Sequence, residues 1–314
     1  SANKLPRTVS PRWILFVFLL TVDVIRGFAI TLMYRPSVVV GFGGYVSFPV
    51  VLSGWMLRVP TVIHEQNVAL GRANKKLIHI ADKIAFSFDE SVGSVRERKE
   101  RVRVTGNPTR SEVGRCGREE AIRELGLDDR LFTILILGGS QGSERLNEAV
   151  LRAVQTFPVS VKKEIQIVHI SGENDFERLT RDYASSEVKH RVFSFVEDIA
   201  FAYGASDLAI SRSGSSAMFE LAKLAKPMIL VPYPYADQHQ KENAAAFSSK
   251  GAAIYVDEKE IGAGLFADLI IEIMHDRPRR ERLSERARMI SSPDASDRLA
   301  DEVIQLAEGR TDVL

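Results

Sequence analysis

Short apolar runs alternate with amphipathic stretches along most of the chain. Such runs are typical of buried strands, and apolar positions spaced i, i+3, i+4 and i+7 between them are typical of helices with one buried face. One amphipathic stretch follows an apolar run at 207–210 and a glycine turn at 213–216, and its apolar positions are Met218, Leu221, Ala222 and Ala225. Because strands that alternate with helices form parallel βαβ units, the sequence predicts an α/β protein.

The alternation falls into two blocks. The first has predicted strands at 37–40, 61–63, 83–86 and 102–104, with helices at 48–57 and ending at 80. The second has predicted strands at 131–137, 165–170, 192–195, 207–210, 228–231 and 252–256, with helices from 143, at 176–184, 198–204, after 214, within 260–290 and at 296–307. The charged, glycine-containing stretch 112–130 is typical of a linker. We therefore expect two domains, residues 1–113 and 114–293.

The most hydrophobic stretch, residues 13–34, predicts a long helix near the N-terminus. Asp23 and Arg26 lie in its middle, and each would cost about 2.5–3.5 kcal/mol at the centre of a bilayer. A membrane span is therefore not expected. A secretory leader is not expected either, because no small-residue cleavage site follows the stretch. Basic residues precede the helix, at Lys4, Arg7 and Arg12. The sequence favours an anionic membrane surface as a partner and a core helix of the first domain about equally.

Composition and charge narrow the function classes. Lys and Arg total 42 against 41 Asp and Glu, so no charge excess indicates a nucleic-acid partner. The single cysteine, Cys116, excludes an internal disulfide and a multi-cysteine metal site. No D-x-D sequence occurs, and the six histidines show no metal-ligand spacing such as H-E-x-x-H. Neither a metal nor a cofactor is expected.

Two glycine turns in the second block follow buried strands and precede helices, at 138–142 and 213–216. The first amides of a helix have no intrahelical partner, so such turns can bind phosphate oxygens. Glu220 lies one turn beyond Ser216, where its carboxylate could accept two ribose hydroxyls. Each signal alone is weak, and a solvated charge on the helix surface is the alternative for Glu220.

Several motifs, in order, resemble one family. In the second half they are Gly139-Ser140-Gln141-Gly142, Arg212-Ser213-Gly214, Glu220, and Asp237-Gln238-His239-Gln240 followed by Asn243-Ala244. Upstream they are Gly41-Phe42-Gly43-Gly44-Tyr45-Val46-Ser47, His64-Glu65-Gln66-Asn67 and Gly106-Asn107-Pro108-Thr109-Arg110. From about Arg35 to the C-terminus the chain resembles the MurG family of peptidoglycan glycosyltransferases.

The resemblance implies the glycosyltransferase-B architecture, in which two Rossmann-like doubly wound domains face a cleft. The last helix, at about 294–314, would pack back on the N-terminal domain. It also implies a metal-independent, inverting hexosyltransferase that moves N-acetylglucosamine from UDP onto a lipid-linked muramyl pentapeptide, lipid I to lipid II. Such an enzyme would lie peripherally on the cytoplasmic face of the cell membrane.

Site residues follow from the resemblance, position by position. The residues implied to bind UDP-N-acetylglucosamine are Asn67, Arg110, Ser140, Val196, Ser215, Ser216, Ala217, Met218, Phe219, Glu220 and Gln240. Among them, Val196 would offer its backbone to the uracil ring, Asn67 would reach the donor sugar, and Arg110 would reach the donor site from across the interdomain cleft. The loop at Gly43, Gly44 and Tyr45 would face the diphosphate of the lipid acceptor.

The family's first strand and its G-G-T-G-G-H loop do not occur in the sequence, so we expect an incomplete N-terminal domain, an incomplete acceptor site and no family-typical catalytic base. His64 and Glu65 are the remaining candidates for catalysis, although a lone loop histidine is more often structural. The alternative function is a non-catalytic sugar-nucleotide-binding or membrane-partner subunit of a split glycosyltransferase. A dinucleotide oxidoreductase is disfavoured, because Gly41, Gly43 and Gly44 do not form G-x-G-x-x-G.

Overall fold

The structure is a computed structural model that describes residues 12–95, 99–138, 143–235 and 238–311. It divides into two compact units. Unit 1 consists of Ser1–Pro108 and Asp294–Leu314, and unit 2 of Thr109–Pro293. The division thus falls before Thr109, where the sequence placed it after residue 113.

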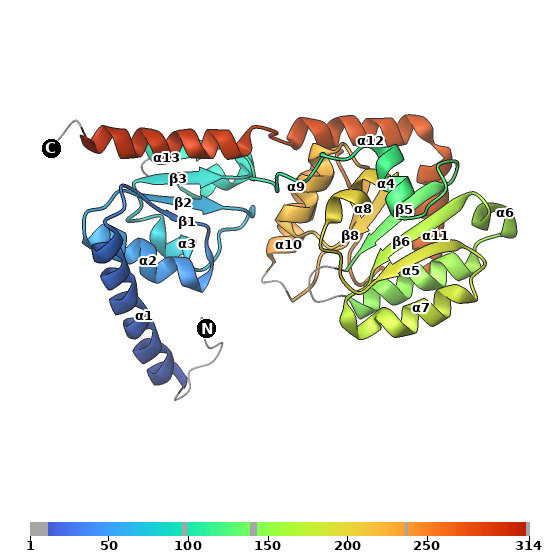
Figure 1. The fold of residues 1–314 in the computed structure, drawn as a ribbon, viewed down its shortest axis with the longest axis horizontal. Coiled ribbons are helices and arrows are strands. Elements are labelled where there is room, and N and C mark those ends of the chain that lie inside the picture. The colour runs from blue at the N-terminus through green and yellow to red at the C-terminus, as the bar shows by residue number, and fades with distance from the viewer. Residues whose placement is uncertain (1–11, 96–98, 139–142, 236–237, 312–314) are drawn as a thin grey trace. The chain divides into compact units, whose positions relative to one another are not determined.

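Unit 1 is built on a parallel sheet of four strands in the order β1 (Val39–Gly41), β2 (Thr61–Glu65), β3 (Lys83–Phe86) and β4 (Val102–Val104). Figure 1 shows α2 (Gly44–Met56) and α3 (Asn74–Leu77) on one face of the sheet and α13 (Ala295–Thr311) along the other. Short 3-10 helices, Asp89–Ser94 and Lys99–Arg101, precede β4. All four strands predicted for the first block are therefore present.

The C-terminal helix α13 covers one face of this sheet through a small apolar cluster. Leu299 packs with Val62 and Ala85 from the sheet. Glu302, one turn further along α13, accepts hydrogen bonds from Lys83 Nζ at 3.0 Å and from Arg103 Nε at 3.1 Å. Apolar packing and this three-membered charge cluster thus hold α13 on unit 1.

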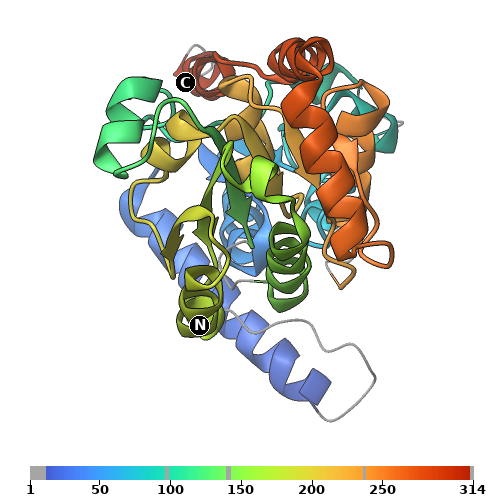
Figure 2. The ribbon, with the colours of Figure 1, turned by 90° about the vertical axis from the view of Figure 1, so that its right-hand side faces the viewer.

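Helix α1 (Arg12–Tyr34) matches the helix that the sequence predicts at 13–34. Its C-terminal half packs closely on α2, because Gly27 has no side chain and a Cβ there would lie 2.9 Å from Ser53 Oγ. Its N-terminal turns extend away from α2 (Figures 1 and 2). Within the described residues α1 is long and apolar enough, by length and composition, to cross a membrane over Ile14–Tyr34, and only 11% of its most apolar window is buried. Most of this apolar window is therefore exposed in the structure.

Unit 2 is a parallel sheet of six strands in the order β10-β9-β8-β5-β6-β7. The strands are β5 (Phe132–Leu137), β6 (Ile165–Ile170), β7 (Lys189–Phe193), β8 (Leu208–Ser211), β9 (Met228–Leu230) and β10 (Ile254–Tyr255). The helices are α4 (Arg118–Glu124), α5 (Glu144–Thr156), α6 (Val159–Lys162), α7 (Phe176–Ala184), α8 (Ile199–Ala205), α9 (Ser215–Lys223), α10 (His239–Ser249), α11 (Ala263–His275) and α12 (Arg277–Ile290). The strand order reverses between β5 and β8, which is where open α/β sheets bind ligands, outside the carboxyl ends of the strands.

Helices α4 and α6 were not predicted in unit 2, and strand β7 was misplaced. Helix α4 lies inside the stretch predicted as a linker, because Ala121 and Ile122 pack with Ala205 in a small cluster of their own. Strand β7 begins and ends earlier than the predicted 192–195. It lies at the edge of the sheet and carries exposed charged residues, so it has no continuous apolar run to mark it.

A buried polar cluster fixes the proton position on His169 in β6. His169 Nε2 lies 3.0 Å from Asn147 Oδ1, and its Nδ1 lies 3.0 Å from the Tyr183 hydroxyl. The Asn147 amide nitrogen donates to Ser171 O and Asp175 Oδ2, so the Asn147 oxygen accepts from His169 Nε2–H. The imidazole is thus neutral, and burial lowers the pKa of His169 to about 3.

Acid is expected to destabilise unit 2 through this histidine. In the unfolded chain the pKa of His169 returns to about 6.5. Below that pH the unfolded state therefore binds a proton that the folded imidazole does not bind. Stability is therefore present above pH 6.5 and falls as the pH drops, by about 2 kcal/mol between pH 7 and pH 5. Urea unfolding at both pH values measures the loss. The loss of unfolding free energy should be smaller in His169→Gln and unchanged in His275→Gln, a control at an exposed position. Equal losses in both variants would contradict the assignment.

Candidate functional site

The first group of candidate site residues surrounds the start of α9 in unit 2. Strand β8 ends at Ser211, and the chain turns through Ser213 and Gly214 into α9. Gly214 has φ −70°, which any residue can adopt, yet a Cβ there would meet no atom within 4 Å. The glycine therefore leaves open space in front of the first amides of α9, where a phosphate can accept hydrogen bonds.

Glu220 lies one turn inside α9, and its side chain is only 3% exposed. Arg110 donates to both carboxylate oxygens, each at 2.8 Å, and the Tyr203 hydroxyl donates to Oε2 at 2.9 Å. The hydrogen bond to Glu220 raises the pKa of Arg110, and burial raises the pKa of Tyr203, so Arg110 stays charged and Tyr203 stays neutral. Glu220 is not a solvated surface charge.

Arg110 corrects one expectation. It belongs to unit 2 together with Glu220, and so it does not reach the donor site from the other domain. The pairing also means that the carboxylate expected to bind ribose already holds a bidentate partner.

Arg212 ties three segments of unit 2 together at the carboxyl ends of the strands. Its side chain is 6% exposed and forms an ion pair with Glu258, whose side chain is 8% exposed. It donates from Nε to Ser143 Oγ at 3.0 Å and from Nη1 to the carbonyls of Val231 and Pro232 at 3.2 and 3.3 Å. The Arg212 guanidinium also lies 5.4 Å from the centre of the Tyr233 ring. Arg212 thus connects Ser143, which directly follows the glycine turn at 138–142, to the end of β9.

The residues around Gln240 connect the same loops. The Ser213 hydroxyl donates to Gln240 O at 2.8 Å, and Asn243 Nδ2 donates to Ser213 O at 3.3 Å. The Gln240 side-chain oxygen accepts from Tyr233 N at 2.8 Å. Gln240 thus stabilises the loop after β9.

In unit 1 the candidate catalytic pair does not form a dyad. His64 and Glu65 are consecutive residues of β2, so their side chains point to opposite faces of the sheet. Glu65 is buried and accepts hydrogen bonds from Gly71 N and Asn74 Nδ2 at 2.8 Å and from Asn67 N and Nδ2 at 3.1 Å. Glu65 therefore anchors the loop that follows β2.

His64 is fully buried, with Nε2 3.1 Å from Gly106 O. Since a carbonyl can only accept, Nε2 carries the proton. The other ring nitrogen, Nδ1, has no hydrogen-bond partner within the described part of the chain. Burial lowers the pKa of His64, so its Nδ1 lone pair is free of a proton at neutral pH.

The glycine turn before α2 requires its glycines. Gly43 and Gly44 have φ values of 79° and 74°, in the left-handed region that side chains disfavour. A Cβ on Gly44 would meet no atom within 4 Å, so the space in front of α2 is open as it is in front of α9. Across the described ranges, no three His, Cys, Asp or Glu side chains are grouped to hold a metal ion.

Comparison with known proteins decides the family. The glycosyltransferase family 28 N-terminal domain matches residues 1–86 and its C-terminal domain matches residues 133–299. A Halothermothrix orenii protein named UDP-N-acetylglucosamine–N-acetylmuramyl-(pentapeptide) pyrophosphoryl-undecaprenol N-acetylglucosamine transferase is 33% identical, over 88% of this chain and 76% of the relative. A Chlorobium phaeobacteroides protein of the same name is 36% identical over 87% of this chain and 73% of the relative. The chain belongs to the MurG family.

Solved structures agree with this family. The crystal structure of Acinetobacter baumannii MurG matches with a TM-score of 0.74 and 26% identity, over 97% of this chain and 83% of that chain. A UDP-GlcNAc 2-epimerase from Neisseria meningitidis, solved with UDP-GlcNAc bound, matches with a TM-score of 0.66 and 12% identity, over 96% of this chain and 83% of that chain. The epimerase shows the shared fold alone. The predicted glycosyltransferase-B fold is confirmed.

The residues that the MurG resemblance assigned to the donor differ in how accessible they are to a ligand. Ser215, Ser216 and Ala217 lie in the open first turn of α9. Met218 and Phe219 have fully buried side chains, so only their backbone can face a ligand. Val196 is half-buried in the loop between β7 and α8. Ser140 lies outside the described residues, and so does Asp237 of the motif that contains Gln240.

Three roles around this candidate donor site were not predicted from the sequence. The hydroxyl of Tyr203 and the carboxylate of Glu258 complete the polar surroundings of Glu220 and Arg212. Arg212 was named only as part of a motif. An arginine directly after a buried strand is a usable signal, because a charge at that position needs a buried partner.

Proposed function

We propose that the chain transfers N-acetylglucosamine from UDP-N-acetylglucosamine to an undecaprenyl-diphosphate-linked muramyl pentapeptide, which is the conversion of lipid I to lipid II in peptidoglycan synthesis. The observation that carries the proposal is the likeness, over 88% of this chain, to a transferase named for that reaction. The geometry of unit 2 supports a sugar nucleotide as donor. The open start of α9 suits the diphosphate, and Glu220, which the resemblance assigns to the donor, lies one turn further along α9.

The reaction we propose is a single displacement with inversion. A hydroxyl of the acceptor sugar attacks the anomeric carbon, the bond from that carbon to UDP breaks, and the hydroxyl proton passes to a base. The departing diphosphate gains negative charge, which helix amides and Arg110 can stabilise without a metal ion. His64, the base candidate from the sequence, is fully buried and its Nδ1 is not accessible to an acceptor hydroxyl in this structure. Glu65 holds the adjacent loop with Asn67.

UDP is expected to bind this chain in the presence of EDTA, because helix amides and Arg110 take the place of a cation. ADP is expected to bind much more weakly, because the backbone at Val196 would discriminate the base while Glu220 sees only ribose. Titration calorimetry with both nucleotides, with and without EDTA, measures this. The proposal fails if magnesium is needed to restore UDP binding, or if ADP binds as tightly as UDP.

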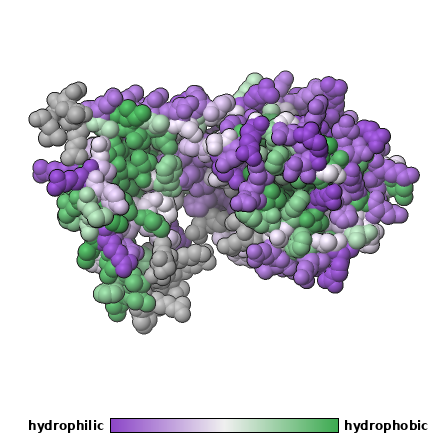
Figure 3. Space-filling view, in the orientation of Figure 1, coloured by the Kyte–Doolittle hydropathy of each residue, from purple (hydrophilic) through white to green (hydrophobic). Residues whose placement is uncertain are grey.

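We also propose that unit 1 binds the cytoplasmic face of the cell membrane peripherally. The N-terminal half of α1 exposes large apolar side chains, at Ile14, Leu15, Val17 and Phe18. Figure 3 shows hydrophobic residues gathered over α1 on the face in view. Lys4, Arg7 and the Arg12 side chain, the basic flank expected from the sequence, lie outside the described residues.

Binding to anionic vesicles is expected to weaken with salt, because the basic flank acts through screened charge while apolar side chains bury in the interface. Flotation of phosphatidylglycerol vesicles measures the bound fraction. Replacing Lys4, Arg7 and Arg12 with Glu should abolish flotation at low salt, and unchanged flotation would contradict the proposal. Replacing three exposed basic residues of unit 2, Arg152, Arg181 and Lys250, with Glu changes the net charge by the same amount and is the control.

A further inference from the structure

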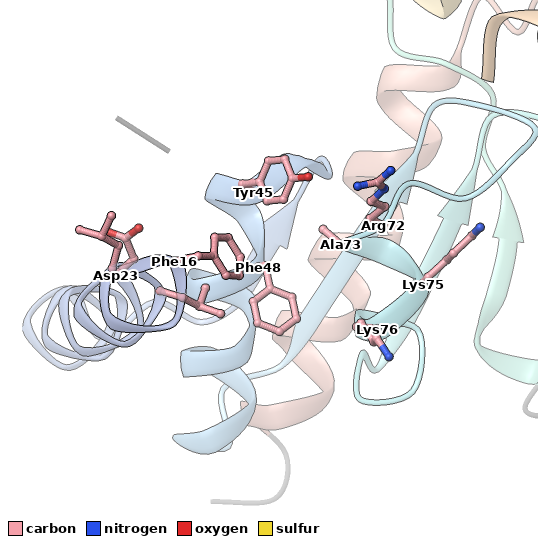
Figure 4. A pocket seen from close by; sticks show the side chains of 10 residues that line it. Phe16, Asp23, Tyr45, Phe48, Arg72, Ala73, Lys75 and Lys76 are labelled. Atoms are coloured by element: carbon pink, nitrogen blue, oxygen red, sulfur yellow. The ribbon is translucent and has the colours of Figure 1, made fainter. Parts of the chain in front are cut away.

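A polar hollow of about 210 Å³ lies in unit 2, between α12, the turn after α9 and the start of β8. It differs from the apolar hollow of unit 1 that Figure 4 shows, whose lining includes Tyr45 from the loop assigned to the acceptor. Ser206 and Asp207 precede β8, and Lys226 precedes β9, so the polar hollow lies at the amino ends of both strands. The candidate donor loops follow the carboxyl ends of these strands. The polar hollow is therefore separate from the donor site.

One face of α12 lines the polar hollow with charged and hydroxyl side chains. They are Arg277, Arg280, Glu281 and Ser284, whose spacing of i, i+3, i+4 and i+7 places them on one side of the helix. Arg277 is exposed and donates from Nε to Glu281 Oε1 at 2.7 Å. Asp207 is the other acidic residue of the lining, and Arg118 donates to both of its carboxylate oxygens at 3.0 Å. Each carboxylate of the lining thus has an arginine partner.

Lys226 and Arg280 add positive charge to the lining, and the groups that bind them are neutral. Lys226 Nζ donates to Ser206 O at 2.7 Å and to Gly204 O at 3.1 Å. Arg280 Nη1 donates to two backbone carbonyls near the C-terminal end of α11, each at 2.8 Å. These bonds use two of the three donors of the Lys226 ammonium and only one nitrogen of the Arg280 guanidinium. The polar hollow therefore has a surplus of positive charge.

Burial makes the charge of Lys226 costly. It lowers the pKa of Lys226 to about 8, although the nearby charge of Asp207 raises it. At neutral pH the side chain is still mostly an ammonium ion, and an anion beside it would offset the lost hydration. Lys226 and Arg280 together match the charge of a dianion, whereas a carboxylate ligand would neutralise only one of them.

We propose that the polar hollow binds a single phosphate group, which belongs either to free inorganic phosphate or to a small phosphate monoester. Sites for drug-sized ligands occupy roughly 300–1,000 Å³, so a hollow of about 210 Å³ suits a ligand of this size. Lys226 and Arg280 bind the charge, and the Ser284 hydroxyl can donate a further hydrogen bond. Arg277 can donate to the same phosphate from its Nη groups while Nε stays on Glu281. The inference does not depend on the transferase proposal, because no donor residue takes part.

Equilibrium dialysis with radiolabelled inorganic phosphate at neutral pH measures binding to the whole chain. UDP is present in excess, so that phosphate does not fill the donor loops. We expect about one phosphate per chain with a Kd of about 1 mM or lower. Unlabelled glycerol phosphate distinguishes the two sources, because it competes only if the polar hollow accepts a phosphate monoester.

Ser284→Glu adds a carboxylate to the lining and should weaken phosphate binding roughly tenfold or more, because like charges repel. Ser160→Glu is the matched control, since Ser160 is exposed on α6 and does not line the polar hollow. Lys226→Gln keeps an N–H donor for the Ser206 carbonyl but removes the charge, so it should also weaken phosphate binding. Circular dichroism verifies that the variants are folded.

Three outcomes overturn the inference. They are no phosphate bound in the presence of UDP, equal phosphate binding by the parent chain and a folded Ser284→Glu variant, and equal competition by acetate, which would show that the polar hollow does not select a dianion. UDP affinity is expected to be the same in Ser284→Glu and the parent chain. A parallel loss of UDP and phosphate in Ser284→Glu would place the phosphate at the donor loops and overturn the inference as well.

Discussion

Arg212→Met is expected to lower the free energy of unfolding of unit 2 by about 3 kcal/mol, because it leaves the Glu258 carboxylate buried without its main partner. Breaking a buried ion pair from one side costs about 3–5 kcal/mol. The lower end applies here, since Arg145 lies 3.9 Å from Glu258 and can move closer. UDP affinity should fall by roughly tenfold or more, a loss of at least about 1.4 kcal/mol, because Ser143 and the loop after β9 lose their common anchor.

Urea unfolding and titration with UDP measure the two effects. Arg212→Lys restores the charge but not the fork that reaches Ser143, Glu258 and the Val231 carbonyl together, so UDP binding should stay weak. Arg277→Met is the matched control, because Arg277 pairs with Glu281 at the surface and such pairs contribute about 0–1 kcal/mol. An Arg212→Met protein as stable as the parent chain would show that the buried pair has no net value.

Most of the fold could be predicted because its strands are buried and its helices are amphipathic. The predicted strands at 83–86, 102–104 and 165–170 and the predicted helix at 176–184 have the bounds of β3, β4, β6 and α7. Helix α4 was missed because it buries little more than Ala121 and Ile122. Edge strand β7 was misplaced because only β6 pairs with it, so its charged side chains can remain exposed.

The site could be predicted only where local sequence determines it. A buried strand, a glycine and an amphipathic helix place Ser215 and Glu220 without knowledge of tertiary structure. The partner of Glu220 could not be predicted in this way, because Arg110 is 110 positions away in sequence and only the folded unit brings the two side chains together. The opposite orientation of His64 and Glu65 was missed because the predicted strand ended at residue 63, whereas β2 extends to Glu65 and consecutive strand residues alternate between faces.

Removal of Arg110 is expected to affect UDP and uridine in opposite directions. In the structure Arg110 donates to both oxygens of Glu220, and the Tyr203 hydroxyl donates to Oε2 as well. A carboxylate has about four lone-pair positions, so one remains, which is too few for two ribose hydroxyls. Ribose binding to Glu220 therefore requires Arg110 to leave. Its side chain is 52% exposed and has room to do so.

UDP and uridine differ in the interactions that they offer to the displaced Arg110. UDP offers its diphosphate to the released guanidinium, and hydrogen bonds between charged groups contribute about 1.5–3 kcal/mol. Uridine offers nothing to Arg110, so it must break the pair without compensation. Arg110→Ala should thus weaken UDP by about 1.5–3 kcal/mol and strengthen uridine, whose hydroxyls would then satisfy a buried carboxylate that lacks a partner.

Titration calorimetry of both ligands with the parent chain and with Arg110→Ala measures the crossover, and thermal unfolding verifies that the variant is folded. Glu220→Gln should weaken both ligands, because it replaces a charged acceptor of the ribose hydroxyls with a neutral one. Arg152→Ala is the control, since Arg152 forms an exposed pair with Glu148 on α5 and should change neither affinity. Parallel losses of UDP and uridine in Arg110→Ala would mean that Arg110 holds Glu220 in place for the ribose rather than competing with it.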